Sequence, residues 1–295
     1  MRIAVTGARG QLGAALVHEF AQAHQIVAAF GRAELDISDD AKVNALLSPV
    51  NPELILNAAA FTDVDACEER PVEALESNAF GVRALARLAQ AHRATLVHYS
   101  TDFVFDGNAS SPYTEEDPPG PRSVYAASKL LGEWFAMDAP RAYVLRVESL
   151  FGQAPGGGPP KGSAAGIMNT LKAGGTPKVF EDRTITPSYL LDITRATRQL
   201  VESKAPVGLY HCVNTGQCTW VEFAREMARL LGLEPRFAPV RMADMKLPAS
   251  RPMFCALSND KLRHLGIEMP RWQDSLKTYL ESLGHEVAHE IADRQ

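Results

Sequence analysis

The chain has 295 residues, of which 46% are hydrophobic and 22% charged, and its formal net charge at pH 7 is −5. Because phosphate neutralisation needs clustered Lys and Arg and the sequence contains no such run, we expect no nucleic-acid partner. No apolar stretch approaches the roughly 18 residues of a membrane span, no charged leader precedes the first apolar run, and the four cysteines form no Cys-x-x-Cys pair, so we expect a cytoplasmic protein with reduced thiols and no membrane partner.

Residues 2–23 predict a strand, a glycine-rich turn and a helix. Residues 2–5 are apolar with β-branched members, and residues 11–23 carry apolar positions at helical spacing. Glycine at such a turn permits positive φ and lets a pyrophosphate approach the N–H groups at the helix start. The spacing is Gly-x-x-Gly-x-x-Gly rather than the commoner Gly-x-Gly-x-x-Gly, and a purely steric role for the glycines is the alternative. We expect a dinucleotide to bind here, at Gly7, Arg9, Gly10, Gln11, Leu12 and Gly13.

A second strand is predicted at 25–30, and the residues after it indicate which dinucleotide binds. An acidic side chain at this point would bind the ribose 2′-hydroxyl, whereas this chain has Arg32, whose guanidinium suits a 2′-phosphate. The alternative for Arg32 is a solvated side chain in a loop. Asp36 and Ile37 follow and would flank the adenine. We therefore expect NADPH as the cofactor, with NADH as the other candidate.

Strands and helices continue to alternate, which predicts a parallel sheet covered on both faces. Further strands are expected at 54–57, 95–99, 143–147 and 208–213, and helices at 71–92, 121–137, 220–231 and 272–283. A loop is expected at the Gly- and Pro-rich residues 155–162. The predicted fold class is α/β, a doubly wound parallel sheet with a smaller C-terminal substrate-binding part. We expect residues 1–150 to form the dinucleotide-binding domain, to which the chain returns around 187–214, and residues 151–186 and 215–295 to form the substrate-binding part.

Tyr125 and Lys129 lie four residues apart in the helix expected at 121–137, so both side chains lie on one face of that helix. A tyrosine with a pKa near ~10 is a poor proton source at neutral pH, and a nearby ammonium lowers that pKa. We therefore expect Lys129 to tune Tyr125 in a redox site. The structural alternatives are a half-buried helix residue for Tyr125 and a solvated charge for Lys129.

Over nearly its whole length the chain resembles the extended short-chain dehydrogenases/reductases, and within them dTDP-4-dehydrorhamnose reductase and its relatives. The resemblance rests on an ordered set of segments, at 6–13, 35–37, 57–65, 100–107, 125–129, 132–133, 208–211, 214, 216, 220–224, 251–252 and 262–272. It implies a Rossmann-type fold and reduction of the C4 keto group of a nucleotide-linked deoxysugar, dTDP-4-dehydro-L-rhamnose to dTDP-L-rhamnose. The sequence does not disclose the oligomeric state, for which a homodimer is one candidate.

The resemblance also implies roles for individual residues. Tyr125 would donate a proton to the C4 carbonyl oxygen, Thr101 would hold that oxygen, and Lys129 would bind the ribose and lower the tyrosine pKa. Thr101 could otherwise be a hydroxyl at a strand end that caps a turn. Further residues implied to bind the cofactor are Ala58, Ala59 and Ala60. Those implied to bind the substrate are Val64, Asp102, Phe103 and Ser149.

Phe103 favours reduction over dehydration. The related sugar-nucleotide 4,6-dehydratases place Glu after Thr-Asp, because elimination of water needs an acid/base pair beyond the tyrosine, and a phenyl ring cannot shuttle protons. Two alternatives stay open: a sugar-nucleotide 4-epimerase, which needs the same Tyr/Lys pair, and a non-catalytic NADP-binding regulatory subunit, since fold alone does not establish turnover.

Three residues depart from the pattern of these reductases. Ser149 stands where a tryptophan is usual beside the sugar, Glu148 adds a charge next to it, and Ala126 replaces the glycine that commonly follows the catalytic tyrosine. Loss of the indole removes a stacking surface and adds a hydroxyl, so these departures bear on the sugar rather than on the chemistry.

Residues 285–289 match the His-Glu-x-x-His pattern of zinc proteases. Only six residues follow the second histidine, and they offer no third ligand at the usual distance. We interpret this match as accidental and expect no metal site.

Overall fold

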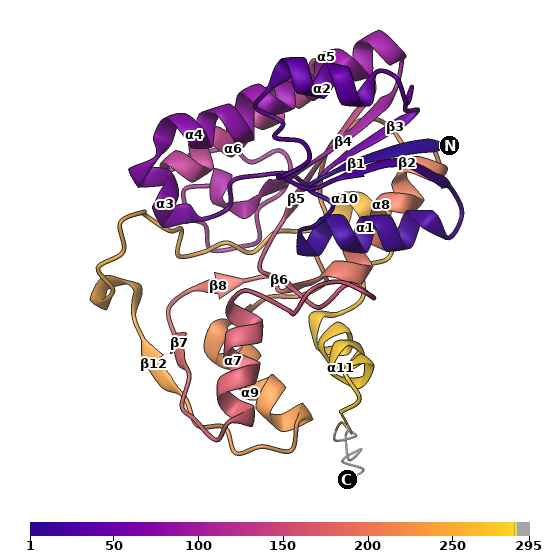
Figure 1. Cartoon of the computed structure of the whole chain (residues 1–295). Coiled ribbons are helices and arrows are strands. Elements are labelled where there is room, and N and C mark those ends of the chain that lie inside the picture. Colours follow the sequence, from indigo (N-terminus) through magenta and orange to yellow (C-terminus); the bar gives the residue numbers. More distant parts are fainter. Residues whose placement is uncertain (286, 288–295) are drawn as a thin grey trace.

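Six parallel strands form the central sheet of the computed structural model, which describes residues 1–285 and 287 (Figure 1). Their order is β10-β5-β4-β3-β1-β2, and neighbouring strands are parallel throughout. The strands are β1 (Arg2–Thr6), β2 (Gln25–Phe30), β3 (Leu54–Asn57), β4 (Thr95–Thr101), β5 (Ala142–Val147) and β10 (Gly208–His211). Every residue of β3 and β5 is buried, as expected for inner strands of a sheet covered on both faces. The predicted doubly wound α/β fold is confirmed.

Helices cover both faces of the sheet (Figure 1). One layer contains α1 (Gln11–Ala21), α8 (Leu190–Glu202) and α10 (Asp260–His264), and the other contains α2 (Asp40–Leu47), α5 (Gly81–His92) and α6 (Val124–Met137). Leu16 and Ile193 anchor the first layer and Val43 and Leu85 the second, all fully buried. Since each such side chain contributes about 1.5–3 kcal/mol on burial, the two layers hold the strand ends in place.

The helix expected at 71–92 is divided by a π-helical turn. α3 (Val64–Glu69) and α4 (Pro71–Leu75) lead into the π-helix η1 (Glu76–Phe80), after which α5 begins. The Asn78 amide in η1 bonds both backbone groups of Phe61, at 2.7 and 3.0 Å, and donates to Ser128 Oγ at 3.0 Å. The extra residue of the π turn thus directs Asn78 toward the loop after β3 and toward α6.

The C-terminal part lies below the sheet in Figure 1 and has its own apolar core, which includes the fully buried Phe223 and Leu276. Its helices are α7 (Ser163–Lys172), α9 (Trp220–Leu230), α11 (Trp272–Ser282) and the 3₁₀ turn η3 (Met242–Asp244). Its short strands pair as β6 (Leu150–Phe151) with β9 (Ser188–Tyr189), β7 (Lys178–Phe180) with β12 (Ala238–Val240), and β8 (Thr184–Ile185) with β11 (Cys218–Thr219). A capping box between Thr219 and Glu222 starts α9 near the predicted position.

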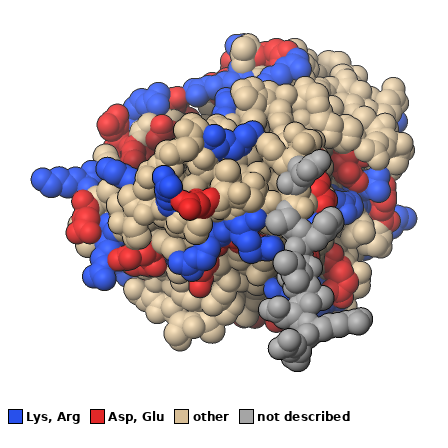
Figure 2. All heavy atoms as spheres, turned by 90° about the horizontal axis from the view of Figure 1, so that it is seen from below, with Lys and Arg blue, Asp and Glu red and all other residues tan. Residues whose placement is uncertain are grey.

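The molecular surface carries mixed charge. Figure 2 shows basic and acidic side chains interspersed over the face seen from below. Among the described residues, no helix combines the length and the apolar character that a membrane crossing requires. The four cysteines are buried free thiols: Cys67, Cys212, Cys218 and Cys255.

Candidate active site

A cavity of about 510 Å³ lies where the carboxyl ends of the strands face the C-terminal part. The predicted site residues that line it are Gly10, Gln11, Leu12, Gly13, Ala58, Ala59, Ala60, Val64, Thr101, Asp102, Phe103, Tyr125, Lys129 and Ser149. An adjoining pocket of about 230 Å³ is lined by the others, Gly7, Arg9, Arg32, Asp36 and Ile37. The two share Gly10 and residues 58–60, so the structure brings all the predicted site residues to one continuous region.

The glycine turn is shaped by close backbone approach. Gly7 has φ 71°, and a Cβ on it would lie 2.5 Å from the backbone of Ala58 and Ala59. A Cβ on Gly13 would collide with the Gly7 carbonyl. α1 then starts after Gly10, which has no side chain to cap it, so the first N–H groups of the helix are left for a ligand. These contacts establish the steric role of the glycines, and binding of an anion at the helix start stays a prediction.

Two arginines stand at the smaller pocket. Arg9 Nη2 lies 2.9 Å from Glu34 Oε1, and Arg32 Nη2 lies 2.7 Å from Glu73 Oε1. The Arg32 side chain is 67% exposed and also lies 3.7 Å from Asp36. Solvated ion pairs of this kind are weak, so a phosphate can compete for both guanidinium groups.

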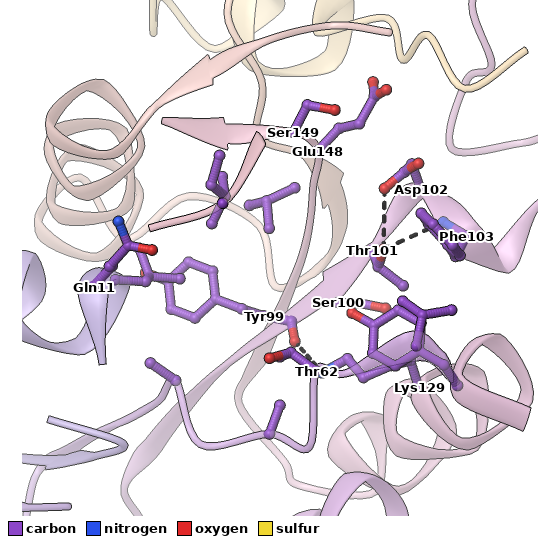
Figure 3. A pocket seen from close by; sticks show the side chains of 18 of the residues that line it. Gln11, Thr62, Tyr99, Ser100, Thr101, Asp102, Phe103, Lys129, Glu148 and Ser149 are labelled. Carbon is purple, nitrogen blue, oxygen red and sulfur yellow. Dashed lines mark hydrogen bonds between the residues drawn. The ribbon is translucent and has the colours of Figure 1, made fainter. Parts of the chain in front are cut away.

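α6 places Tyr125 and Lys129 on the wall of the larger cavity. The helix begins at Val124, three residues later than predicted, because Ser123 Oγ accepts the Ala126 N–H and caps it. Tyr125 is 8% exposed and Lys129 only 2%, so the solvated alternative for Lys129 is wrong. Lys129 Nζ donates to the Tyr99 carbonyl at 2.6 Å (Figure 3).

Thr101 ends β4 and caps the next turn, as in the structural alternative, while its role in holding the substrate oxygen stays a prediction. Its Oγ1 donates to Asp102 Oδ1 at 3.0 Å and accepts the Phe103 N–H at 3.3 Å, which caps the 3₁₀ turn η2 (Asp102–Val104) (Figure 3). Its hydroxyl also interacts with the Tyr125 hydroxyl. The Phe103 ring meets Tyr125 edge-on, with centroids 5.6 Å apart, and so packs against the phenol.

The expected lowering of the Tyr125 pKa by Lys129 is not what the structure gives. Burial raises the Tyr125 pKa above its ordinary value because phenolate loses hydration, the Thr101 hydrogen bond opposes this, and the charge of Asp102 adds to it. Burial lowers the Lys129 pKa to about 8, opposed by Glu133. Tyr125 is therefore a neutral phenol with a proton to donate.

A buried charge cluster, missed from the sequence, borders Asp102. Arg183 Nη2 lies 3.6 Å from Asp102 Oδ2 and donates to Cys255 Sγ at 3.2 Å. Glu148 Oε2 accepts the Thr186 N–H at 2.8 Å, and burial raises the Glu148 pKa well above its ordinary value. Asp102, Glu148 and Cys255 could together ligate a cation, but the Arg183 guanidinium already lies among them. Nothing in the local sequence around Arg183 could have revealed these partners, because they come from three distant segments.

Ser149 occupies a strained position between β5 and β6. Its φ is 42°, in the left-handed region that favours glycine, and its side chain lines the larger cavity beside Glu148 and Asp102 (Figure 3). Of the residues in the His-Glu-x-x-His match, which we interpret as accidental, Glu286, Ala288 and His289 lie outside the described residues.

A further cavity of about 520 Å³ adjoins the cavity of about 510 Å³ and extends into the C-terminal part. The two share Ser163, Arg183 and Trp220. The second also contains Lys178 and Arg251 beside Phe180, and thus combines cationic with aromatic walls. Trp220 and Arg251 lie in segments that carry the family resemblance, but sequence reasoning assigned none of these residues a role in the site, because each is isolated in its own segment.

Comparison with known proteins agrees with this geometry. The family model described as the RmlD substrate binding domain matches residues 1–285. A dTDP-4-dehydrorhamnose reductase from Streptomyces griseus is 35% identical, over 92% of this chain and 90% of the relative. A probable dTDP-4,6-dihydroxy-2-methyloxan-3-one 4-ketoreductase from Streptomyces antibioticus is also 35% identical, over 94% of each chain. The crystal structure of the dTDP-4-dehydrorhamnose reductase from Bacillus anthracis in complex with NADP is 29% identical, with a TM-score of 0.88 over 95% of this chain and 99% of that one. The chain belongs to the RmlD substrate binding domain family, together with curated dTDP-4-dehydrorhamnose reductases.

Proposed function

We propose that the protein uses NADPH to reduce the C4 keto group of a nucleotide-linked deoxysugar, with dTDP-4-dehydro-L-rhamnose as substrate and dTDP-L-rhamnose as product. The observation that carries the proposal is a single cavity lined by the glycine turn and by Thr101, Tyr125 and Lys129. Relatives that are 35% identical over most of the chain are named as reductases of such keto-sugars.

The residues at the strand ends fit NADPH. The cradle around Gly7 and Gly13 has no room for a Cβ, the uncapped start of α1 suits a pyrophosphate, and Arg32 with Arg9 suits a 2′-phosphate. When bound, NADPH supplies the hydride for the carbonyl carbon. In this proposal residues 1–150, with the return at 187–214, bind the dinucleotide, and residues 151–186 and 215–295 bind the sugar nucleotide.

Tyr125 supplies the proton. As a neutral phenol it donates to the C4 oxygen. The Thr101 hydroxyl, which donates to Asp102 Oδ1 in the structure, would turn its hydrogen toward the same oxygen and hold it. Phe103 packs against the phenol and restricts its movement. Lys129, with a pKa that burial lowers to about 8, binds the ribose.

The two joined cavities suit an elongated ligand with a sugar at one end and a nucleotide at the other. The sugar would lie by Val64, Asp102, Phe103 and Ser149 in the cavity of about 510 Å³. Arg183, Lys178 and Arg251 would face the diphosphate in the cavity of about 520 Å³. An aromatic wall is available there for a base, from Phe180 and Trp220.

The test is to incubate the purified protein with NADPH and dTDP-4-dehydro-L-rhamnose and to follow the loss of reduced-nicotinamide absorbance. We expect stoichiometric NADPH consumption and dTDP-L-rhamnose as product. Since Ser149 replaces an aromatic wall, other 4-keto sugar nucleotides belong in the same panel to identify the preferred sugar. NADPH binding without consumption by any of them would favour the regulatory alternative, and sugar epimerisation without net consumption would favour the epimerase.

Two properties expected from the sequence remain predictions, namely a homodimer and a cytoplasmic location. Light scattering of the purified chain tests the first, and fractionation of the source cells tests the second.

A further inference from the structure

A buried chain of hydrogen bonds connects the glycine turn to Lys129. Thr6 Oγ1 donates to Asn57 Oδ1 at 2.8 Å, the Asn57 amide nitrogen lies 3.0 Å from His98 Nδ1, and His98 Nε2 lies 3.5 Å from Lys129 Nζ. Thr6, Asn57 and His98 come from β1, β3 and β4, and none of the three is more than 1% exposed. The chain therefore crosses the core of the sheet directly behind the cavity wall.

The bonds of Asn57 determine where the proton of His98 lies. The Ala59 backbone N–H, which can only donate, is bonded to Asn57 Oδ1 at 3.1 Å, so the amide oxygen faces Ala59 and the NH₂ group faces His98. Because an NH₂ group is a donor, His98 Nδ1 must accept and carries no proton. Burial and the charge of Lys129 both lower the His98 pKa well below its ordinary value, so the imidazole is neutral. Its single proton is on Nε2, the nitrogen that faces Lys129.

An N–H group pointed at Lys129 Nζ opposes the ammonium form of the lysine. An ammonium has three donors and no acceptor, whereas a neutral amine has a lone pair that can accept the His98 N–H. The Tyr99 carbonyl accepts a hydrogen bond from Lys129 Nζ, with an N–O distance of 2.6 Å, and so holds Nζ beside the imidazole. Because Gly132 has no side chain, the His98 ring has room beside it. A Cβ at this position would lie 3.3 Å from His98 Nε2 and would overlap the Asn78 carbonyl oxygen.

The other ionisable groups around Lys129 have partners of their own. Glu133, one turn further along α6, favours the ammonium, but its carboxylate accepts two bonds from Arg146 on β5, both at 2.8 Å, and one from Ser100 on β4. Tyr125 lies one turn earlier on α6 and is neutral. His98 on β4 is thus the group whose hydrogen-bonding polarity can alter the proton affinity of Lys129 without a change of net charge.

We propose that His98 is a positioning residue for Lys129: its Nε2–H, aligned by Asn57, points at Lys129 Nζ and favours the amine over the ammonium form of this lysine. The inference rests on the proposed function only for its purpose, which is to let Lys129 change protonation state during reduction. The hydrogen-bond chain itself requires no substrate.

The test measures the titration of Lys129 directly, by NMR of ¹³Cε-labelled lysine in the intact protein, with Lys129→Met to assign the signal. Wild type is expected to titrate at about 8. In His98→Gln the flexible amide can turn its oxygen toward Nζ, and we expect the Lys129 midpoint to rise by about one pH unit or more. The alkaline limb of kcat/KM, measured on an active preparation, should rise by the same amount.

The matched control is His211→Gln. His211 on β10 is equally buried and neutral, but its Nδ1 bonds the Tyr113 carbonyl at 3.1 Å rather than any part of the Lys129 chain. We expect the Lys129 titration in this variant to match wild type.

A second variant covers the case in which His98→Gln does not fold. In Asn57→Asp the carboxylate keeps the bonds from Thr6 and Ala59 and accepts from His98 Nδ1, which moves the proton from Nε2 and leaves a lone pair for the ammonium. The Lys129 midpoint should again rise. An unchanged Lys129 titration in the folded variant would overturn the proposal. Because the titration is measured without substrate, it tests His98 even if the proposed reaction proves wrong.

Discussion

Tyr125 shows how one residue acquires a function that its side chain lacks in water. Burial keeps its phenol protonated, while Thr101 and the edge-on ring of Phe103 restrain its orientation. The spacing of Tyr125 and Lys129 was readable from the sequence because helical periodicity places i and i+4 together. The direction of the Tyr125 pKa shift could not be predicted from the sequence, because desolvation depends on the side chains from β4 and α3 that surround the phenol.

Tyr125→Phe should lower kcat by about 10²–10⁴-fold, the range for loss of a general acid. The change removes the transferable proton and leaves the cofactor cradle intact, so the Kd for NADPH should stay within about twofold of wild type. Steady-state kinetics and a fluorescence titration of NADPH measure the two quantities. Wild-type turnover in this variant would remove Tyr125 from the mechanism.

Lys129→Met should weaken NADPH binding and lower kcat together. The substitution keeps a chain of similar length but removes the charge expected at the ribose and the donor to the Tyr99 carbonyl. The same titration and kinetics apply. If both quantities were unchanged, the proposed ribose contact would not exist.

At the scale of the elements, the strand–turn–helix at the N-terminus was predictable because its signals are local: apolar β-branched residues, three glycines, then helical periodicity. The π-helical turn η1 was not, since Asn78 adopts its place through bonds to Phe61 and Ser128, 17 and 50 residues away. The Arg183 cluster escaped prediction for the same reason.

Gly13→Ala should abolish tight NADPH binding and destabilise the protein. A Cβ at this position collides with the Gly7 carbonyl, so α1 would have to move away from the turn that it completes. NADPH titration and urea unfolding are the measurements. Gly166→Ala in α7 is the control, because a Cβ there meets nothing within 4 Å. It should raise the free energy of unfolding by about 0.5–1 kcal/mol and leave NADPH affinity unchanged; equal behaviour of the two variants would contradict the account of the turn.

At the scale of the whole molecule, the parallel sheet and the approximate strand positions followed from alternation along the chain. The joined cavities could not be predicted in this way. They form where loops from the sheet meet β7, α7 and α9, and such contacts leave no periodic signal in the sequence. The buried histidines likewise depend on which strands become neighbours.

Acid should destabilise the fold through His211. Burial of this side chain lowers its pKa to about 3. The unfolded chain binds a proton at this histidine below about pH 6.5 and the folded chain does not, so stability falls as pH drops from about 6.5 toward 3. Between pH 7 and 5 the loss from this group is about 2 kcal/mol. Urea unfolding of His211→Gln at the two pH values should show a pH-dependent loss smaller by that amount. Equal losses in wild type and His211→Gln would show that His211 is not held neutral in the fold.

NADPH deuterated at the transferred position shows whether hydride reaches the C4 carbon, the step on which the proposed reduction depends. Mass spectrometry and NMR of the product from dTDP-4-dehydro-L-rhamnose should show one deuterium, bound to C4, for each NADPH oxidised. Product without deuterium at C4, or conversion of the sugar with no NADPH oxidised, would contradict the account.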